Sequence, residues 1–141
     1  MKYFYTKVPG KVISLSINKY LYIIVKKRFD KKIVLNYSNR EIVDNIDEIK
    51  HSLIRESLRL LDIKSSIEIT SIADIPSKGS GLGSSSSFTV GLLNALFAFK
   101  GEKASQERLA EIACKIEIDI CGAPIGKQDQ YGASIGGLKA I

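Results

Sequence analysis

The sequence predicts an α+β domain, because segments typical of strands and segments typical of helices follow one another in mixed order. Residues 11–17, 20–25 and 32–37 are rich in β-branched and aromatic residues or alternate apolar with polar ones. Residues 88–99 and 105–120 instead carry apolar residues at helical spacing. With 141 residues, 45% of them hydrophobic, the chain is expected to form one domain with a buried core.

The first half of the chain is expected to place one helix among strands. The three N-terminal segments are predicted to be consecutive antiparallel strands. Asn45 is predicted to cap a helix with acidic residues in its first turn and apolar positions from Ile46 to Leu61. Residues 66–72 (Ser-Ile-Glu-Ile-Thr-Ser-Ile) form the next predicted strand.

The second half is expected to contain two helices and a final short strand. Residues 88–99 are apolar on nearly all sides, so this helix is predicted to lie at the buried centre, with Gly101 as its C′ residue. Ser105 is predicted to cap the next helix, which ends near Pro124. Residues 127–130 form a polar segment to which no helix is assigned, and residues 138–141 resemble a strand.

Charge and the rarer residues narrow the classes of function. The net charge of +6 suits an anionic ligand, but the lysines form no long basic run, so nucleic-acid binding is a weak alternative. Cys114 and Cys121 are predicted to be reduced thiols of a cytoplasmic protein. The sole histidine, His51, is predicted to lie at the surface and disfavours multi-histidine metal sites. No apolar run is long enough to span a membrane.

A glycine- and serine-rich stretch at residues 75–88 separates a predicted strand from a strongly apolar helix. Glycine tolerates positive φ and close approach of a ligand, and the following helix, starting near Gly83, would turn unpaired amides and a partial positive charge toward the loop. The alternative is a flexible linker. A Walker A loop would need lysine where Ser84 stands, and the glycine spacing is not that of a dinucleotide-binding fingerprint. A phosphate-binding loop is the favoured interpretation.

Two carboxylates downstream of this loop suggest a use for a bound phosphate. Glu117 lies near a helix end, and Asp129 follows a proline turn. Mg²⁺ prefers oxygen ligands, and phosphoryl transfer needs a group that orients or deprotonates the attacking hydroxyl. Taken alone, such a pair is also compatible with an ordinary charged surface.

The sequence motifs around these residues resemble those of a known protein family. Residues 76–85 (P-S-K-G-S-G-L-G-S-S) are similar to the ATP loop of the GHMP kinases, which include galactokinase, homoserine kinase and mevalonate kinase. Residues 117–131, with G-K-Q-D-Q-Y at their end, and the later Gly136-Gly137 resemble the downstream segment of the sugar-kinase branch. The resemblance covers the chain from about Lys11 onward and implies a two-layer fold like domain 2 of ribosomal protein S5, a mixed sheet with helices on one face.

The resemblance also implies residue roles. Asp129 matches the catalytic aspartate of the family, and Ser85 and Glu117 match its Mg²⁺ ligands. ATP phosphates would be wrapped by the loop residues Lys78, Gly79, Ser80, Gly81, Leu82, Gly83, Ser84, Ser85 and Ser86. Independently of the family, Lys127 is expected to favour the charged form of Asp129. The implied function is transfer of the ATP γ-phosphate to a hydroxyl of a phosphorylated sugar, with G-K-Q-D-Q-Y favouring a heptose 7-phosphate-like acceptor.

The chain departs from the family pattern at both ends. The first family motif and the C-terminal domain are not found in these 141 residues, so residues 1–141 are expected to be one N-terminal ATP-binding domain of a kinase. We expect such a piece to bind ATP weakly and to have little activity by itself, with the other kinase portions or a second copy as partners. The alternative is a non-catalytic nucleotide-binding module of the same fold.

Overall fold

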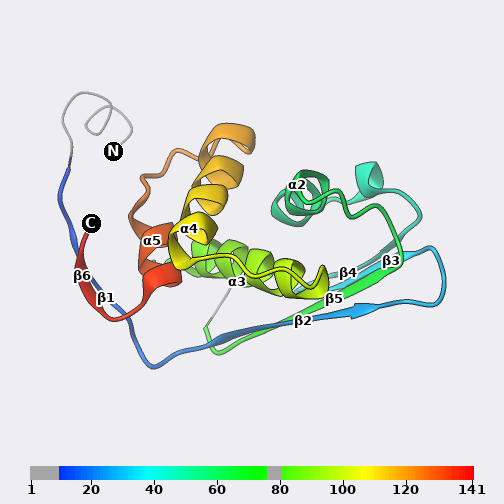
Figure 1. The fold of residues 1–141 in the computed structure, drawn as a ribbon, viewed down its shortest axis with the longest axis horizontal. Coiled ribbons are helices and arrows are strands. Elements are labelled where there is room, and N and C mark those ends of the chain that lie inside the picture. Colours follow the sequence, from blue (N-terminus) through cyan, green and yellow to red (C-terminus); the bar gives the residue numbers. More distant parts are fainter. Residues whose placement is uncertain (1–9, 76–80) are drawn as a thin grey trace.

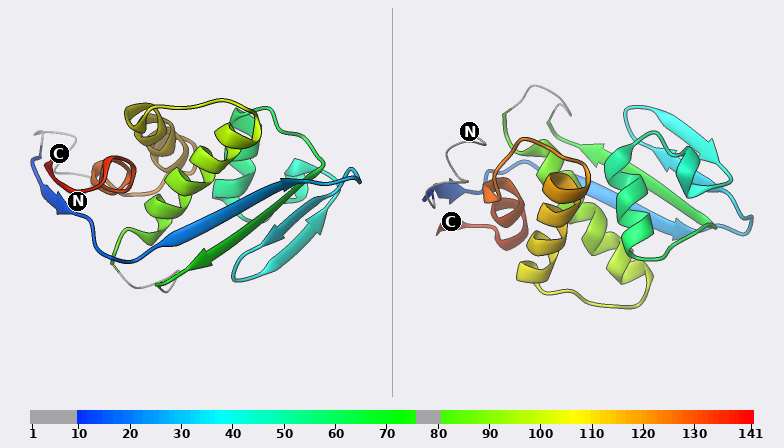
Figure 2. Two further views of the ribbon diagram at one scale, coloured as in Figure 1. Left: turned by 60° about the horizontal axis from the view of Figure 1, so that its bottom comes forward. Right: turned by 90° about the horizontal axis from the view of Figure 1, so that it is seen from above.

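The computed structural model describes residues 10–75 and 81–141, and these form two layers. Figure 1 and the turned views of Figure 2 show the helices gathered on one side of a twisted four-stranded sheet, with a small two-stranded sheet beside them. The α+β architecture with a mixed sheet and helices on one face is confirmed.

The main sheet has the strand order β2-β5-β3-β4. β2 (Leu21–Lys27) pairs antiparallel with β5 (Ile67–Ala73), and β3 (Ile33–Asn36) pairs antiparallel with β4 (Arg40–Val43). β5 also pairs with β3, in parallel. It therefore lies between β2 and the β3–β4 hairpin and joins them into one sheet. The sheet is therefore mixed, and β2 is one of its edges.

The prediction of three consecutive antiparallel strands is wrong in two respects. β5 lies between β2 and β3, because its alternating Ile67 and Ile69 complete the helix-facing side of the sheet with 0% and 2% exposure. β1 (Ile13–Leu15) is not in this sheet at all but pairs antiparallel with β6 (Leu138–Ala140). The final strand was therefore predicted correctly, and its partner was not.

The predicted first helix is divided into two pieces. Asn45 caps the 3-10 turn η1 (Ile46–Glu48), where its side chain accepts from the Asp47 amide, and α2 (Ser52–Leu60) begins four residues later. The Glu41 carboxylate on β4 accepts bonds from the amides of Lys50 and His51, which holds this connection in a non-helical conformation.

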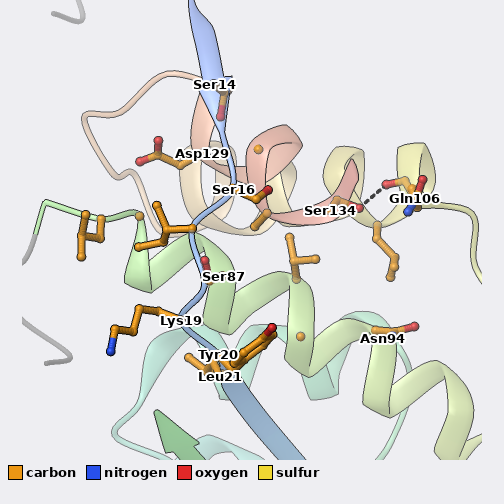
Figure 3. Close-up of a pocket in the computed structure, with 18 of the residues that line it drawn as sticks. Ser14, Ser16, Lys19, Tyr20, Leu21, Ser87, Asn94, Gln106, Asp129 and Ser134 are labelled. Carbon is orange, nitrogen blue, oxygen red and sulfur yellow. Dashed lines mark hydrogen bonds between the residues drawn. The ribbon is translucent and has the colours of Figure 1, made fainter. Parts of the chain in front are cut away.

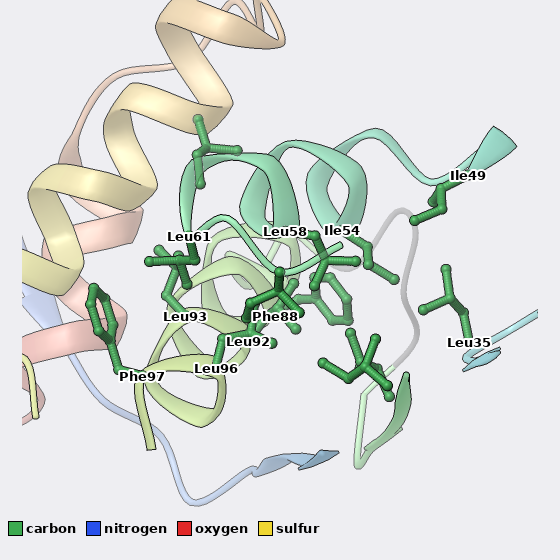
Figure 4. Packing of buried hydrophobic residues seen from close by; sticks show 14 of the residues in the cluster. Leu35, Ile49, Ile54, Leu58, Leu61, Phe88, Leu92, Leu93, Leu96 and Phe97 are labelled. Atoms are coloured by element: carbon green, nitrogen blue, oxygen red, sulfur yellow. The ribbon is translucent and has the colours of Figure 1, made fainter. Parts of the chain in front are cut away.

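α3 (Ser84–Phe99) is the buried centre of the fold, as predicted. Leu92, Leu93 and Leu96 are fully buried between α2 and the sheet, and Figure 4 shows them meeting the α2 side chains. The helix ends in a Schellman motif, since Gly101 has a φ of +77° and the Glu102 amide donates to the Phe97 carbonyl.

The C-terminal helices complete the helical layer. α4 (Gln106–Cys114) is capped by Ser105 as predicted and runs on into a π-helical segment, η2 (Lys115–Ile120). α5 (Gln128–Ile135) occupies the polar segment to which no helix was assigned. Gln130 is the one buried residue of α5, so the segment lacks the apolar spacing by which sequence analysis detects helices.

His51, predicted to lie at the surface, is only partly exposed. Its ring packs at 4.8 Å from the ring centroid of Tyr37 and at 5.1 Å from that of Phe88. Burial lowers the pKa of His51, although the nearby Glu41 charge acts in the opposite direction. His51 is thus a packing residue between the sheet and α3.

None of the helices within residues 10–75 and 81–141 combines the length and apolar character needed to cross a membrane.

Candidate active site

Two glycines of the predicted phosphate-binding loop precede α3 in the left-handed conformation. Gly81 and Gly83 both have a φ of +66°, a conformation that glycine adopts without strain, and the helix begins at Ser84. The first-turn amides of a helix point out of its N-terminus, here toward the glycine loop. Of the predicted ATP-loop residues, Lys78, Gly79 and Ser80 lie outside the described residues.

The Glu117 carboxylate lies buried at the base of this loop. Its exposed fraction is 1%, and it accepts four hydrogen bonds. Ser85 Oγ donates at 2.8 Å and Thr89 Oγ1 lies at 3.0 Å from one carboxylate oxygen, while Ser86 Oγ at 2.7 Å and Gln130 Nε2 contact the other. α3, η2 and α5 therefore meet at one carboxylate.

The π-helical segment explains how Glu117 reaches this position. A π turn carries an extra residue per turn, which changes the face that the following side chains present. In η2, the consecutive residues Ile116 and Glu117 are both buried, at 0% and 1% exposure. This turn therefore directs a carboxylate into the helical layer beside an apolar core residue.

The donors around Glu117 are all neutral. In the described part of the chain, no lysine, arginine or histidine forms an ion pair with it. A buried charge without a counter-charge is costly, so the cluster is suited to a cation. Residues 10–75 and 81–141 contain no group of three or more His, Cys, Asp or Glu side chains that could hold a metal. One carboxylate with hydroxyls fits Mg²⁺ that also binds phosphate oxygens.

Asp129 reaches the same loop from the other side. It is half-buried in the first turn of α5, and a β-carbon at Gly83 would lie 3.4 Å from Asp129 Cγ and 3.7 Å from Oδ2. Asp129 thus lies against the residue that starts α3, while Glu117 contacts Ser85 two positions further on. The structure brings together Gly83, Ser85 and both carboxylates singled out from the sequence.

A cavity of about 580 Å³ opens beside Asp129 and Gly83. Figure 3 shows its walls, formed by the chain between β1 and β2, by α3 and by α5. Its polar lining is mostly neutral and includes Ser14, Ser16, Ser87, Asn94 and Gln106, with Lys19 contributing a cation. A polyhydroxylated molecule could lie here with one hydroxyl against Asp129.

Lys127 and Asp119 lie at a different, smaller cavity. With Cys114 they line a space of about 200 Å³ that Asp129 does not line. Burial raises the pKa of the Cys114 thiol to about 11, so this thiol is protonated and a poor nucleophile at neutral pH. The role expected for Lys127 toward Asp129 stays a prediction.

Three contacts of the site were not anticipated. Ser86 was predicted to contact ATP phosphates through its backbone amide, and no role was given to its hydroxyl, which is bonded to Glu117 in a residue that is 2% exposed. Thr89 and Gln130 were not singled out. Thr89 lies one turn after Ser85, and this i, i+4 spacing was the available signal. The sequence contained no comparable signal for Gln130, because α5 itself was not predicted.

Residues 35–137, more than half of the chain, match the family model described as GHMP kinases N terminal domain. The chain belongs to this family of kinases.

Among curated proteins, it is 30% identical over 144 residues to the D-glycero-alpha-D-manno-heptose 7-phosphate kinase of Campylobacter jejuni subsp. jejuni serotype O:2, an alignment that covers 94% of this chain and 42% of that protein.

Solved structures lead to the same family. A D-glycero-D-manno-heptose 1-phosphate kinase from Bacteriodes thetaiotaomicron superposes with a TM-score of 0.83 at 27% identity, covering 93% of this chain and 46% of that one. A putative sugar kinase from Campylobacter jejuni superposes with a TM-score of 0.78 at 26% identity, covering 93% and 43%. The chain thus spans less than half the length of the relatives it matches.

Proposed function

We propose that this chain is the ATP-binding part of a sugar kinase, which transfers the γ-phosphate of ATP to a hydroxyl of a phosphorylated sugar. The observation that carries the proposal is the convergence of Glu117 and Asp129 on the start of α3, from two separate segments of the chain. A loop with backbone amides, a buried carboxylate and a second, accessible carboxylate are the parts that phosphoryl transfer requires.

The loop and the metal ligands would hold the nucleotide. The residues assigned to the ATP phosphates are Lys78, Gly79, Ser80, Gly81, Leu82, Gly83, Ser84, Ser85 and Ser86. Mg²⁺, when bound, neutralises phosphate charge and withdraws electron density from the phosphorus. Ser85 and Glu117 are its proposed ligands, and the buried neutral donors hold the Glu117 carboxylate in a fixed orientation.

Asp129 is the proposed base. It would accept the proton of the acceptor hydroxyl as that oxygen attacks the γ-phosphorus, while the bond from the γ-phosphorus to the ADP oxygen breaks. The acceptor would occupy the cavity that Asp129 lines, among the neutral hydroxyl and amide groups of its walls. The relatives' names favour a heptose phosphate as the acceptor.

We further propose that residues 1–141 form one domain, and that by themselves they bind ATP weakly and transfer phosphate slowly, with the remaining kinase portions or a second copy as partners. A coupled assay with heptose 7-phosphate tests this, and robust turnover by the chain would contradict it. The second candidate, a non-catalytic nucleotide-binding module, predicts ATP binding without any measurable transfer, even when longer natural chains are assayed.

Calorimetric titration of the chain with ATP, with and without Mg²⁺, tests the nucleotide site directly. We expect binding that requires Mg²⁺ and that loses this requirement in the Glu117→Gln variant. Glu111→Gln is the matched control, because Glu111 is an exposed carboxylate on α4. Absence of binding by the wild-type chain, or equal binding with and without Mg²⁺, would overturn the proposal.

A further inference from the structure

The first turn of α5 contacts the site through Asp129, which lies beside Gly83, and through Gln130, which is bonded to Glu117. The function proposed above gives no role to Gln130. We propose that Gln130 is a positioning residue: its amide holds the Glu117 carboxylate and thereby fixes Asp129 against Gly83. This inference rests on the proposed function, since it concerns how the proposed metal ligand and the proposed base are kept in register.

The geometry of α5 makes the coupling direct. Gln130 is fully buried and its Nε2 contacts Glu117, whereas Asp129, the preceding residue, lies about 100° away around the helix and against Gly83. The other residues of α5 are exposed or half-buried, and a further hydrogen bond of the helix, from Ser134 Oγ to the Gln106 carbonyl at 2.5 Å, lies toward its far end from Asp129. The bond from Gln130 to Glu117 is therefore the buried anchor next to Asp129 in the first turn of α5.

The unpartnered oxygen of Gln130 supports a role beyond packing. Within the described residues, Gln130 Oε1 is buried and has no hydrogen-bond partner, which costs stability. An apolar side chain of the same length would avoid this cost. A reversed amide would place Oε1 against the Glu117 carboxylate, so the observed orientation is imposed by that charge. The amide is useful at this position for its N–H donor.

The donors divide the Glu117 carboxylate into an anchored and an available oxygen. The oxygen held by Gln130 is also held by Ser86, and both residues are buried. The other oxygen is bonded to Ser85, which is exposed, and to Thr89. The Thr89 hydroxyl also lies 3.0 Å from the Ser85 carbonyl, and its single proton can turn there. A cation can therefore take the second oxygen while Gln130 keeps the first.

Nuclear magnetic resonance can test the positioning role without any ligand. Because a β-carbon on Gly83 would be 3.5 Å from Asp129 Cβ, an α-proton of Gly83 lies close enough to the Asp129 β-protons for a nuclear Overhauser effect. We expect this signal in the wild-type chain and in Gln128→Met, where the amide replaced is exposed. In Gln130→Met the signal is expected to disappear while the chain stays folded. An unchanged signal in folded Gln130→Met would overturn the inference.

A double variant covers the case in which Gln130→Met does not fold. Glu117→Gln combined with Gln130→Met removes the buried charge together with its donor, so it is expected to fold and still to lose the Gly83–Asp129 signal. Retention of that signal would overturn the inference.

Titration with MgATP separates this inference from the proposed function. If the wild-type chain binds no MgATP but Gln130→Met loses the signal, the kinase proposal fails and the positioning role stands. If MgATP binds and the signal survives in Gln130→Met, the positioning role alone fails. If both hold, Gln130→Met should bind MgATP roughly tenfold or more weakly, the loss expected for a hydrogen bond to a charged group.

Discussion

The Asp129 carboxylate of the last helix lies beside Gly83, the N-cap of the central helix, at 3.4 Å from the position that a β-carbon of residue 83 would take. Gly83 has a φ of +66°, so any residue with a β-carbon there would be strained, and that β-carbon would lie in contact with Asp129. The backbone therefore favours glycine at this position.

Replacing Gly83 by alanine tests this requirement. The left-handed conformation costs a residue with a β-carbon about 1–2 kcal/mol, and relief of that strain would shift the backbone beside Asp129. We expect Gly83→Ala to lower the free energy of unfolding by about this amount and to weaken MgATP binding, measured by urea unfolding and calorimetry. Gly101→Ala is the control, because Gly101 has a φ of +77° but open space around it. Equal MgATP affinities of the two variants would contradict the prediction.

Two buried serines, Ser57 and Ser86, should respond oppositely to substitution. Ser86 donates to Glu117, whereas Ser57 Oγ is buried without a partner among the described residues. Ser86→Ala leaves a buried carboxylate short of a donor and should cost roughly 1–3 kcal/mol in urea unfolding. Ser57→Ala should be neutral or stabilising, because it removes an unpaired buried hydroxyl. A loss of stability in Ser57→Ala as large as that in Ser86→Ala would refute this difference.

Glu41 should make stability depend on pH. Its own burial acts to raise its pKa, but bonds from the Lys50 amide, the Tyr37 hydroxyl and the His51 amide together lower it below its ordinary value of 4.5. Because the folded state binds this proton less readily than the unfolded state, the contribution of Glu41 is full above pH 4.5 and is lost as the pH falls through the lowered pKa.

The check for Glu41 is urea unfolding at several pH values. The wild-type chain should lose stability between neutral pH and acid, and Glu41→Gln should lose less over the same range while being less stable at pH 7. Asp44→Asn serves as the control, since Asp44 is exposed and pairs with an exposed lysine, Lys32. Parallel pH profiles for the wild type and Glu41→Gln would show that the bonds to Glu41 do not set the dependence.

The side of the sheet opposite the helices should promote self-association. Tyr22, Ile24 and Ile72 lie next to one another on it and are each more than half exposed, at 52%, 54% and 56%. Ile24→Thr should reduce concentration-dependent association in analytical ultracentrifugation and change stability by no more than about 0.5 kcal/mol. Phe29→Ser removes an exposed aromatic from the turn after β2 and should have no such effect. Unchanged association in Ile24→Thr would exclude this face as its source.

Local signals predicted much of the fold correctly. The strand before the glycine loop, the start of α3 at Ser84, and the caps Asn45, Gly101 and Ser105 all follow from nearby residues. Strand order did not follow, because the insertion of β5 between β2 and β3 depends on contacts between distant segments. His51 was misplaced for a similar reason: its neighbours in the chain are charged, but Phe88 covers it in space.

In the candidate site, too, local features could be predicted from the sequence and contacts between distant segments could not. The loop and the two carboxylates could be singled out from their residue types and spacing, although their roles stay proposals. The surroundings of Glu117 could not be foreseen, because they depend on the π turn of η2 and on a helix, α5, whose sequence has no apolar periodicity.

The sparse packing of α5 has a consequence for its motion. A helix that buries a single side chain, and a polar one, should open by local unfolding at far lower free energy than α3, whose leucines are fully enclosed. Amide hydrogen exchange should therefore be fast along α5 and slow along α3 in the free chain. Part of the energy of ligand binding would then be spent on closing α5, and its amides should become protected only when the site is filled.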